Sequence, residues 1–324
     1  MITCLGIEST AHSASLGIMN EKGEILADVK DMYKTEKGGL IPVEVAKHHN
    51  RVFPELLKQI DIEDINIISV SAGPGLAPCL SEGMKFAKDL SKKFKIPLIP
   101  VSHLIAHLEI GKLLTKVKDP VFVLATGANT QIIFFEDKRY HIGGECLDIG
   151  LGNALDKFGR AIGLGFPCGP KIEELAKSGK YIELPYSVKG QDLVFSGIIT
   201  EAINKFKKEV KKEDLCFSLQ ETLFAMLCEV TERAMAHSNK KEALLIGGVA
   251  ANQRLIEMLN IMCKERNANF HVVPLKYSGD NGVMISWQGI LQYKANKKYY
   301  DNLKLENIDI KPNWRADQLE IKYK

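Results

Sequence analysis

Two histidines four residues apart are the first residues in the sequence whose types and spacing could do chemistry. They lie in VSHLIAHLE, residues 101–109, directly after the apolar stretch IPLIPV. If this segment is helical, His103 and His107 share one face, and two neutral imidazoles can bind a transition metal when a third protein ligand completes the site. The alternative is that both histidines cap or pack a helix end. A metalloprotease is disfavoured, because its HExxH motif places a glutamate directly after the first histidine, where this chain has Leu104.

A late aspartate is a candidate for the third ligand. Asp280 lies in SGDNGVMISW, just before a predicted closing helix. Together with the two histidines it would supply two imidazoles and one carboxylate, leaving coordination positions for a phosphate or water. Asp280 could equally be the N-cap of that helix, which would require no metal. The sequence leaves both interpretations open.

Length and composition indicate an intracellular globular protein. The chain has 324 residues, of which 45% are hydrophobic and 26% charged, and this length suggests two domains of roughly 150 residues each. No apolar run approaches the ~20 residues of a membrane span, and the N-terminus lacks the basic region and cleavage site of a signal peptide. The seven cysteines are scattered and never spaced CxxC, which indicates reduced thiols rather than disulfides or a cysteine zinc site. We therefore expect a cytoplasmic protein with no membrane partner.

The net charge of +3 is too small to predict a nucleic-acid partner by itself. Lysines nevertheless gather at residues 91–95 (SKKFK) and 205–212 (KFKKEVKK). A solvated helix face explains each cluster about as well as a phosphate-binding surface does.

The order of predicted elements occurs twice along the chain. Three strands, a helix, a strand, a helix and a strand fill the first part, and the same order begins again near Pro120. We interpret this as a duplicated ribonuclease-H-like unit in an α/β protein, the plan of the actin and sugar-kinase superfamily, in which two lobes flank a nucleotide and metal cleft. The expected division is an N-terminal lobe at 1–118, a C-terminal lobe at 119–295 with a helical insertion at about 146–212, and a tail at 296–324.

Two glycine-rich corners in the second half could contact a nucleotide. The first is ATGANT, at 125–130, between two strands, and the second is GGVAAN, at 247–252, between a strand and a helix. Backbone N–H groups in such corners can bind phosphate oxygens or a polar nucleoside edge. Neither corner matches a P-loop or a GxGxxG motif, and each could be a simple turn. Candidate contacts in these corners are Thr126, Gly127, Ala128, Asn129, Gly247 and Gly248.

Two carboxylates lie between those corners, in GNALDKFGRAIGLGFPCGPKIEELA, residues 152–176. Asp156 lies in the first predicted helix of this segment, and Glu173 lies in the first turn of the second. Carboxylates at helix starts that face a cleft can accept hydrogen bonds from ribose hydroxyls.

An ordered series of motifs resembles the universal tRNA threonylcarbamoyladenosine transferase family. Its bacterial member is TsaD, and its archaeal and eukaryotic members form the catalytic subunit of the KEOPS complex. The resemblance covers nearly the whole chain, and GANTQ is more similar to the archaeal branch. The matching blocks are GIEST (6–10), HLIAH (103–107), GANTQ (127–131), LDIGLGNALDKFGR (147–160), GPKIEELA (169–176), FSG (195–197), GGVAANQRL (247–255) and GDNGVMISW (279–287).

The resemblance implies roles for particular residues. In this family the two histidines and the late aspartate bind a metal, which corresponds to His103, His107 and Asp280. The nucleotide contacts of the family correspond to Thr126, Gly127, Ala128, Asn129, Thr130, Asp156, Gly169, Glu173 and Asn252.

The chain departs from the family pattern at three places. Leu124 replaces a tyrosine that gives an extra metal contact in archaeal relatives, so that contact is absent. His12 and Ser13 replace a bacterial Asp-Glu pair, so no base role carries over. Cys168 replaces a glycine, which would tighten the ribose loop.

The implied reaction transfers threonylcarbamoyl from threonylcarbamoyl-AMP to the exocyclic amine of the adenosine immediately 3′ of the anticodon, in tRNAs that read codons beginning with adenine. The implied cofactors are one divalent metal ion per subunit, iron first with zinc or magnesium as alternatives, and an ATP- or AMP-type nucleotide. The implied partners are tRNA and KEOPS-type subunits, including a small atypical protein kinase and a small dimerising subunit. The alternative function is an actin-like nucleotide-binding regulatory scaffold without transferase chemistry.

Overall fold

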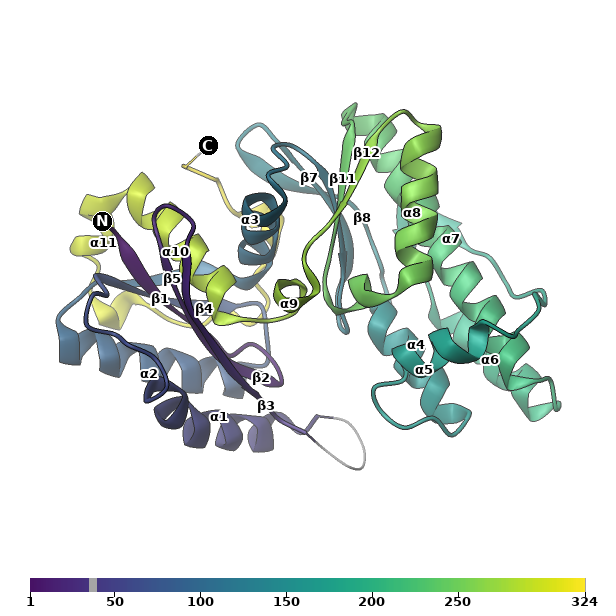
Figure 1. Cartoon of the computed structure of the whole chain (residues 1–324), viewed down its shortest axis with the longest axis horizontal. Helices are drawn as coiled ribbons and strands as arrows, with labels where there is room; N and C mark the ends of the chain where they lie inside the picture. Colours follow the sequence, from purple (N-terminus) through teal and green to yellow (C-terminus); the bar gives the residue numbers. More distant parts are fainter. Residues whose placement is uncertain (35–39, 324) are drawn as a thin grey trace. The chain divides into compact units, whose positions relative to one another are not determined.

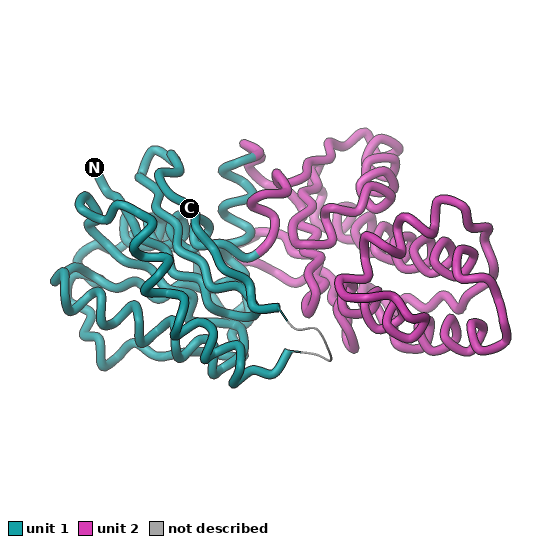
Figure 2. The backbone as a smooth tube through the Cα atoms, turned by 60° about the horizontal axis from the view of Figure 1, so that its bottom comes forward, with its two compact units in different colours: residues 1–114, 280–324 teal, residues 115–279 magenta. Residues whose placement is uncertain are grey.

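The chain forms two compact units, each built around its own five-stranded sheet. The structure is a computed structural model that describes residues 1–34 and 40–323. Unit 1 comprises residues 1–114 and 280–324, and unit 2 comprises residues 115–279 (Figure 2). None of the helices in the described ranges is long and apolar enough to cross a membrane.

Unit 1 contains a mixed sheet with the strand order β3-β2-β1-β4-β5. The first three strands are antiparallel neighbours, whereas β1–β4 and β4–β5 are parallel pairs. Every residue of β1, β2 and β4 is buried, as expected for strands covered on both faces. The strands are β1 (Thr3–Glu8), β2 (Ser13–Asn20), β3 (Ile25–Met32), β4 (Ile67–Gly73) and β5 (Leu98–Ser102).

Helices cover both faces of this sheet (Figure 1). Helices α1 and α2 pack on one face, and α10 packs on β1, β2 and β4 at the other. The apolar core under α1 and α2 includes Leu5, Val52, Phe53 and Val70. The helices of unit 1 are α1 (Pro42–Leu57), α2 (Ala77–Phe94), α3 (His103–Thr115), α10 (Gly282–Ala295) and α11 (Lys297–Asp301), with short 3-10 turns η2 (Leu305–Asn307) and η3 (Ala316–Gln318).

Gly6 and Gly17 in the sheet and Gly282 in α10 let this helix lie directly on the sheet. A Cβ atom on Gly6 would lie 2.1 Å from the Gly282 carbonyl oxygen, and one on Gly17 would lie 2.3 Å from the Val283 nitrogen. Hydrogen bonds hold the close contact, since the Ser286 hydroxyl donates to the Cys4 carbonyl at 2.8 Å and Gly282 N–H donates to the Ser15 hydroxyl at 2.9 Å. The start of α10 is therefore fixed on β1 and β2.

Unit 2 repeats the same topology. Its sheet has the order β12-β11-β6-β7-β8, with antiparallel β6–β7 and β7–β8 and parallel β6–β11 and β11–β12. The predicted duplication and α/β class are thus confirmed. The strands are β6 (Val121–Ala125), β7 (Thr130–Glu136), β8 (Arg139–Glu145), β11 (Glu242–Ile246) and β12 (Asn269–Val272).

Between β8 and β11, unit 2 contains a helical segment that covers the insertion expected at about 146–212 and continues to Ser238. The described part of unit 1 has α1 between the corresponding strands β3 and β4. The elements of the segment are α4 (Leu151–Ala161), α5 (Gly169–Ala176), a hairpin of β9 (Val188–Lys189) and β10 (Asp192–Leu193), α6 (Ser196–Lys207) and α7 (Lys212–Ser238). After β11 follow η1 (Gly248–Ala251), α8 (Gln253–Glu265) and α9 (Leu275–Ser278).

The unit boundary differs from the expected one at the C-terminal end. The sequence-based division placed residues 280–295 in the second lobe and 296–324 in a separate tail, but both segments belong to the compact unit 1. The physical reason is the glycine contact described above, because α10 packs on β1 and β2. Chain order alone does not show which sheet a terminal helix covers.

Candidate metal centre and nucleotide contacts

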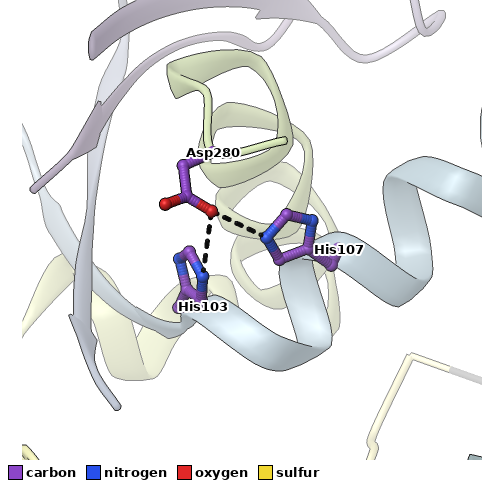
Figure 3. Close-up of side chains that lie close together, drawn as sticks. All are labelled: His103, His107 and Asp280. Atoms are coloured by element: carbon purple, nitrogen blue, oxygen red, sulfur yellow. Dashed lines mark hydrogen bonds and ion pairs between the residues drawn. The ribbon is translucent and has the colours of Figure 1, made fainter. Parts of the chain in front are cut away.

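The structure brings His103, His107 and Asp280 together in unit 1 (Figure 3). The Asp280 Oδ1 atom lies 3.2 Å from His107 Nε2 and 3.5 Å from His103 Nε2. One donor atom from each of the three residues lies within 4.8 Å of the others. Two imidazoles and a carboxylate around one point are a ligand set that divalent transition metals accept.

Local structure explains why the three side chains converge. His103 is the first residue of α3 and His107 lies one turn later, so both project from one face of the helix. Residues 103–111 of α3 are all buried, which keeps the imidazoles out of bulk water. Asp280 stands just before α10, whose position the glycine contacts fix.

The interpretation of Asp280 as the N-cap of the closing helix is wrong. The N-cap is Asn281, whose side-chain oxygen accepts a hydrogen bond from Met284 N–H at 2.9 Å. Because the neighbouring asparagine satisfies the helix terminus, the Asp280 carboxylate is available to face the histidines.

A buried glutamate behind His103 orients that ring. Glu8 is fully buried at the end of β1, and its Oε2 atom lies 2.9 Å from His103 Nδ1. Its Oε1 atom accepts hydrogen bonds from the Thr10 N–H at 2.6 Å and hydroxyl at 2.5 Å. An ionised carboxylate can only accept, so His103 Nδ1 carries a proton, while His103 Nε2 faces Asp280. A metal ion would bind at Nε2 in place of the proton that the imidazolium form carries there. This carboxylate–histidine arrangement is typical of metal-binding histidines.

Glu8 and Thr10 are site residues that the sequence analysis missed. Both lie in GIEST, which the family resemblance includes without assigning them a role. The available signal was an acidic residue at the end of an otherwise apolar buried strand. Such a residue requires a buried partner, because an unpaired buried carboxylate is costly.

The charges of the cluster fit a bound cation. Burial disfavours the imidazolium form of His103, but the nearby Glu8 and Asp280 carboxylates raise its pKa to about 9. Burial lowers the pKa of His107. Burial also opposes ionisation of Asp280, yet the two imidazoles hold the pKa of that carboxyl well below its usual range. Two carboxylates and two imidazoles in a buried cluster have more negative charge than a single imidazolium neutralises, and a divalent ion would balance it.

The second ring forms a hydrogen bond through one nitrogen. His107 Nε2–H donates to Asp280 at 3.2 Å, whereas His107 Nδ1 is buried and has no hydrogen-bond partner within the described residues. A metal bound at Nε2 would require the form with the proton on Nδ1, which no acceptor there opposes or favours.

Replacing Glu8 with glutamine should weaken metal binding without unfolding the protein. The amide retains the size of the side chain and one acceptor oxygen, but it loses the charge that orients and polarises His103. Changes to such a hydrogen-bond partner typically cost 10–100-fold in metal affinity, and we expect a loss of about tenfold for Glu8→Gln and more for Glu8→Ala. Calorimetric titration with Co²⁺ measures both. Equal affinities in the parent and both variants would contradict the assigned role of Glu8.

In unit 2, the first glycine-rich corner forms a tight turn against the start of α4. The Thr126 hydroxyl accepts from Asn129 N–H at 2.9 Å and donates to the Asn129 carbonyl at 3.0 Å. Asn153 N–H donates to the Gly127 carbonyl at 2.9 Å, and the Thr130 hydroxyl accepts from Leu151 N–H at 2.8 Å. Gly127 and Ala128 at the tip are exposed, so their backbone is accessible to a ligand.

The second corner lies against the first one. Gly247 has a φ of +110°, and a Cβ atom there would lie 2.2 Å from the Ala125 carbonyl oxygen, so only glycine fits. The Ser278 hydroxyl fixes Gly247 by accepting from its N–H at 3.0 Å and donating to its carbonyl at 2.8 Å. Gly248 is exposed, and a Cβ atom there would meet nothing within 4 Å. The backbones of the two glycine-rich corners, 125–130 and 247–252, therefore lie close together.

The remaining predicted nucleotide residues connect the helices of unit 2. Asp156 Oδ1 accepts from Cys168 N–H at 2.8 Å, next to Gly169. Glu173 Oε1 accepts from Gln253 N–H at 2.8 Å, at the start of α8. Asn252 caps α8 by accepting from Leu255 N–H at 3.1 Å, and its amide donates to Gln220 at 2.9 Å. Glu173 and Asn252 therefore lie together at the start of α8. The carboxylates of Asp156 and Glu173 each use one oxygen in a hydrogen bond within the protein.

Two of the departures from the family pattern have a structural explanation. Leu124 is a fully buried residue of β6, in the register position opposite Gln131, and contributes to the apolar core. Cys168 is also fully buried, and Gly159 makes room for it, because a Cβ atom on Gly159 would lie 2.3 Å from the Cys168 Cβ atom.

Solved structures with the same architecture identify the class of fold. The chain is similar to the Thermococcus kodakarensis HypF structure, with a TM-score of 0.64 at 15% identity over 92% of this chain and 48% of that one. It is also similar to the activator of 2-hydroxyisocaproyl-CoA dehydratase from Clostridium difficile, with a TM-score of 0.56 at 14% identity over 94% and 99% of the two chains. The protein therefore has the fold of the actin and sugar-kinase superfamily.

Sequence comparison identifies the family within that class. The model of the TsaD family, tRNA N6-adenosine threonylcarbamoyltransferase, matches residues 24–287. The chain belongs to this family and is a transferase.

Individual relatives agree with this assignment over the whole chain. The tRNA N6-adenosine threonylcarbamoyltransferase of Thermococcus kodakarensis is 48% identical over 98% of each protein. That of Thermofilum pendens is 45% identical over 99% of this chain and 96% of the relative. The probable bifunctional tRNA threonylcarbamoyladenosine biosynthesis protein of Methanocaldococcus jannaschii is 46% identical over 99% of this chain, which spans 60% of that relative.

Proposed function

We propose that this chain transfers threonylcarbamoyl from threonylcarbamoyl-AMP to the exocyclic amine of the adenosine immediately 3′ of the anticodon, in tRNAs that read codons beginning with adenine. The observation that carries the proposal is the buried cluster of His103, His107 and Asp280 with Glu8 behind it, in a chain of the TsaD family.

The three residues would hold one divalent ion, iron in the first instance and zinc or magnesium as alternatives. When bound, the ion supplies Lewis-acid chemistry that offsets negative charge on an oxygen of the donor. The protein orients this site through Glu8, which fixes the His103 proton on Nδ1 and leaves Nε2 as the ligand atom.

The adenosine part of the donor would be bound by residues of unit 2. The exposed backbone of Gly127, Ala128 and Gly248 suits phosphate oxygens, and Glu173 and Asn252 lie together at the start of α8, where a ribose could bind. The full proposed set is Thr126, Gly127, Ala128, Asn129, Thr130, Asp156, Gly169, Glu173, Gly247, Gly248 and Asn252.

In the transfer step the adenine amine nitrogen attacks the carbamoyl carbon. A new C–N bond forms, the bond from that carbon to the phosphate oxygen of AMP breaks, and the amine loses one proton. Backbone N–H groups aimed at the developing charge would favour this step. We assign no side chain as a covalent nucleophile.

The proposed partners follow from the substrate and the family. An anticodon-loop adenine is accessible in single-stranded form. The lysines at 205–212, which lie at the end of α6, in the turn that follows it and at the first residue of α7, would contact tRNA phosphates. We further propose KEOPS-type partner subunits, including a small atypical protein kinase and a small dimerising subunit. A tRNA substrate favours a cytoplasmic location.

Glu173→Ala should weaken nucleotide binding and leave metal binding unchanged. The substitution removes hydrogen bonds to a ribose, and charge-assisted bonds of this kind are worth about 1.5–3 kcal/mol. Calorimetric titration with a nonhydrolysable ATP analogue measures the loss. The matched control is Glu174→Ala, because Glu174 is the exposed neighbouring residue, paired with Lys177, and should bind nucleotide as the parent does. Parental affinity in Glu173→Ala would contradict the ribose assignment.

A single-turnover assay tests the proposed function directly. The pure chain, with and without the partner subunits, is mixed with threonylcarbamoyl-AMP labelled in the threonyl group and a tRNA transcript. We expect label in the transcript that has adenosine immediately 3′ of the anticodon and none when guanosine replaces it. Release of the label into water alone, with no modified tRNA under any condition, would contradict the proposal.

A further inference from the structure

Two adjacent histidines of α1, His48 and His49, are buried and contact neither the metal triad nor the nucleotide residues. His49 is fully buried and His48 is 9% exposed. Helix α1 packs against β2 and β3 on unit 1 (Figure 1). Two buried imidazoles side by side require an explanation, because burial of polar groups is unfavourable unless they form hydrogen bonds.

The two rings form a continuous line of hydrogen bonds. His49 Nε2 lies 2.8 Å from the Ala11 carbonyl oxygen, His49 Nδ1 lies 3.3 Å from His48 Nδ1, and His48 Nε2 lies 2.8 Å from Asp31 Oδ1. The line runs from a half-exposed carboxylate on β3 to the backbone of the loop that follows β1. No other hydrogen bond of these rings is needed to satisfy all four nitrogens.

The acceptors at the two ends determine where the protons are. A carbonyl oxygen only accepts, so His49 Nε2 carries a proton. Burial lowers the pKa of His49 to about 4, so this ring is neutral and its Nδ1 atom accepts from His48 Nδ1–H. The Asp31 carboxylate accepts from His48 Nε2–H. These hydrogen bonds connect Asp31 through His48 and His49 to the Ala11 carbonyl.

Ala11 directly follows Thr10, which forms hydrogen bonds with the Glu8 carboxylate. Thr10 donates to Glu8 through both its N–H and its hydroxyl, and Glu8 accepts from His103 Nδ1–H. We propose that His49 is a positioning residue for the metal centre, which fixes the loop at 9–12 through the Ala11 carbonyl and so holds Glu8 against His103. This inference rests on the proposed metal site.

If His49 had only a packing role, its replacement would affect metal binding differently. His49 also packs edge-on against Phe53, with ring centroids 5.8 Å apart. If His49 only filled space, an aromatic ring of similar size would replace it without effect on the metal. His49→Phe keeps a ring and removes both hydrogen bonds, whereas His49→Gln keeps a side-chain donor for Ala11.

The experiment measures Co²⁺ affinity and the Co²⁺ visible absorption spectrum of the full chain. We expect His49→Phe to weaken Co²⁺ binding about tenfold and to shift the spectrum, in line with the effect of other outer-shell changes. His49→Gln should regain part of the affinity. Asp31→Asn should cause a smaller loss, and the substitution lies outside the core because the Asp31 side chain is 51% exposed.

The control is Phe53→Leu, which loosens packing on the same helix and should retain parental affinity and spectrum. Parental Co²⁺ affinity and spectrum in folded His49→Phe, together with altered binding in Glu8→Gln, would overturn the positioning role while leaving the metal site in place. Unaltered binding in Glu8→Gln and in a variant lacking His103 and His107 would instead overturn the metal assignment itself.

Discussion

Replacing His103 and His107 together with alanine is expected to abolish metal binding and transfer activity while the protein stays folded. The double substitution removes two of the three proposed ligands, and the remaining carboxylate cannot hold a transition metal tightly by itself. We expect metal content to fall from about one ion per chain to near zero, and single-turnover transfer to fall at least 10³-fold, an order-of-magnitude estimate from the loss of a metal that stabilises charge. Elemental analysis and the labelled-tRNA assay measure the two losses.

The matched control replaces two histidines of unit 2, His141 and His237, which stack on or lie edge-on to Phe134. This double variant should keep metal and activity. Full metal content in the His103 and His107 variant would contradict the assignment. Loss of the fold would indicate that the two rings are needed for packing, because their removal leaves Glu8 buried without His103, at a cost of about 1–3 kcal/mol.

The second large effect is expected from Gly17→Ala, at a residue that contacts no ligand. A Cβ atom there would lie 2.3 Å from Val283 N and 2.5 Å from the Gly282 carbonyl carbon, which are backbone atoms of α10. Backbone cannot rotate away as a side chain can, so α10 must move off β2. We expect a loss of about 3 kcal/mol in the free energy of unfolding, the upper part of the usual range for overpacking.

The same substitution should also weaken metal binding, because Asp280 immediately precedes α10. Urea unfolding and Co²⁺ titration measure the two effects. Gly197→Ala is the control, since Gly197 lies in α6 and an added Cβ atom would meet nothing within 4 Å; there alanine should stabilise by about 0.5–1 kcal/mol. A Gly17→Ala protein as stable as the parent would show that the contact between β2 and α10 is not tight.

The sequence predicts much of the fold because its patterns are local. Apolar runs and turns mark the repeated strand order, which both sheets confirm. The association of α10 with unit 1 was not predictable in this way, because it depends on Gly6 and Gly17 lying on the same face of two paired strands. That property appears only when the strand register is known.

The candidate metal site shows the same division between local and long-range information. The spacing of His103 and His107 is local and predicts a shared helix face. Glu8 was not predicted, because its partner His103 lies 95 residues away in the sequence. The sequence analysis considered only Asp280 as the cap of the closing helix and not Asn281. Aspartate and asparagine are both common caps, and only the position of α10 decides between them.

The most direct test of the account is the location of the bound metal. An anomalous difference map from crystals of the chain grown with Co²⁺ would place the ion relative to every nitrogen and oxygen. We expect one strong peak within bonding distance of His103 Nε2, His107 Nε2 and a carboxylate oxygen of Asp280, with Glu8 bound to His103 Nδ1 and outside the coordination sphere. A peak at other residues, or a peak bound through His103 Nδ1, would contradict the account.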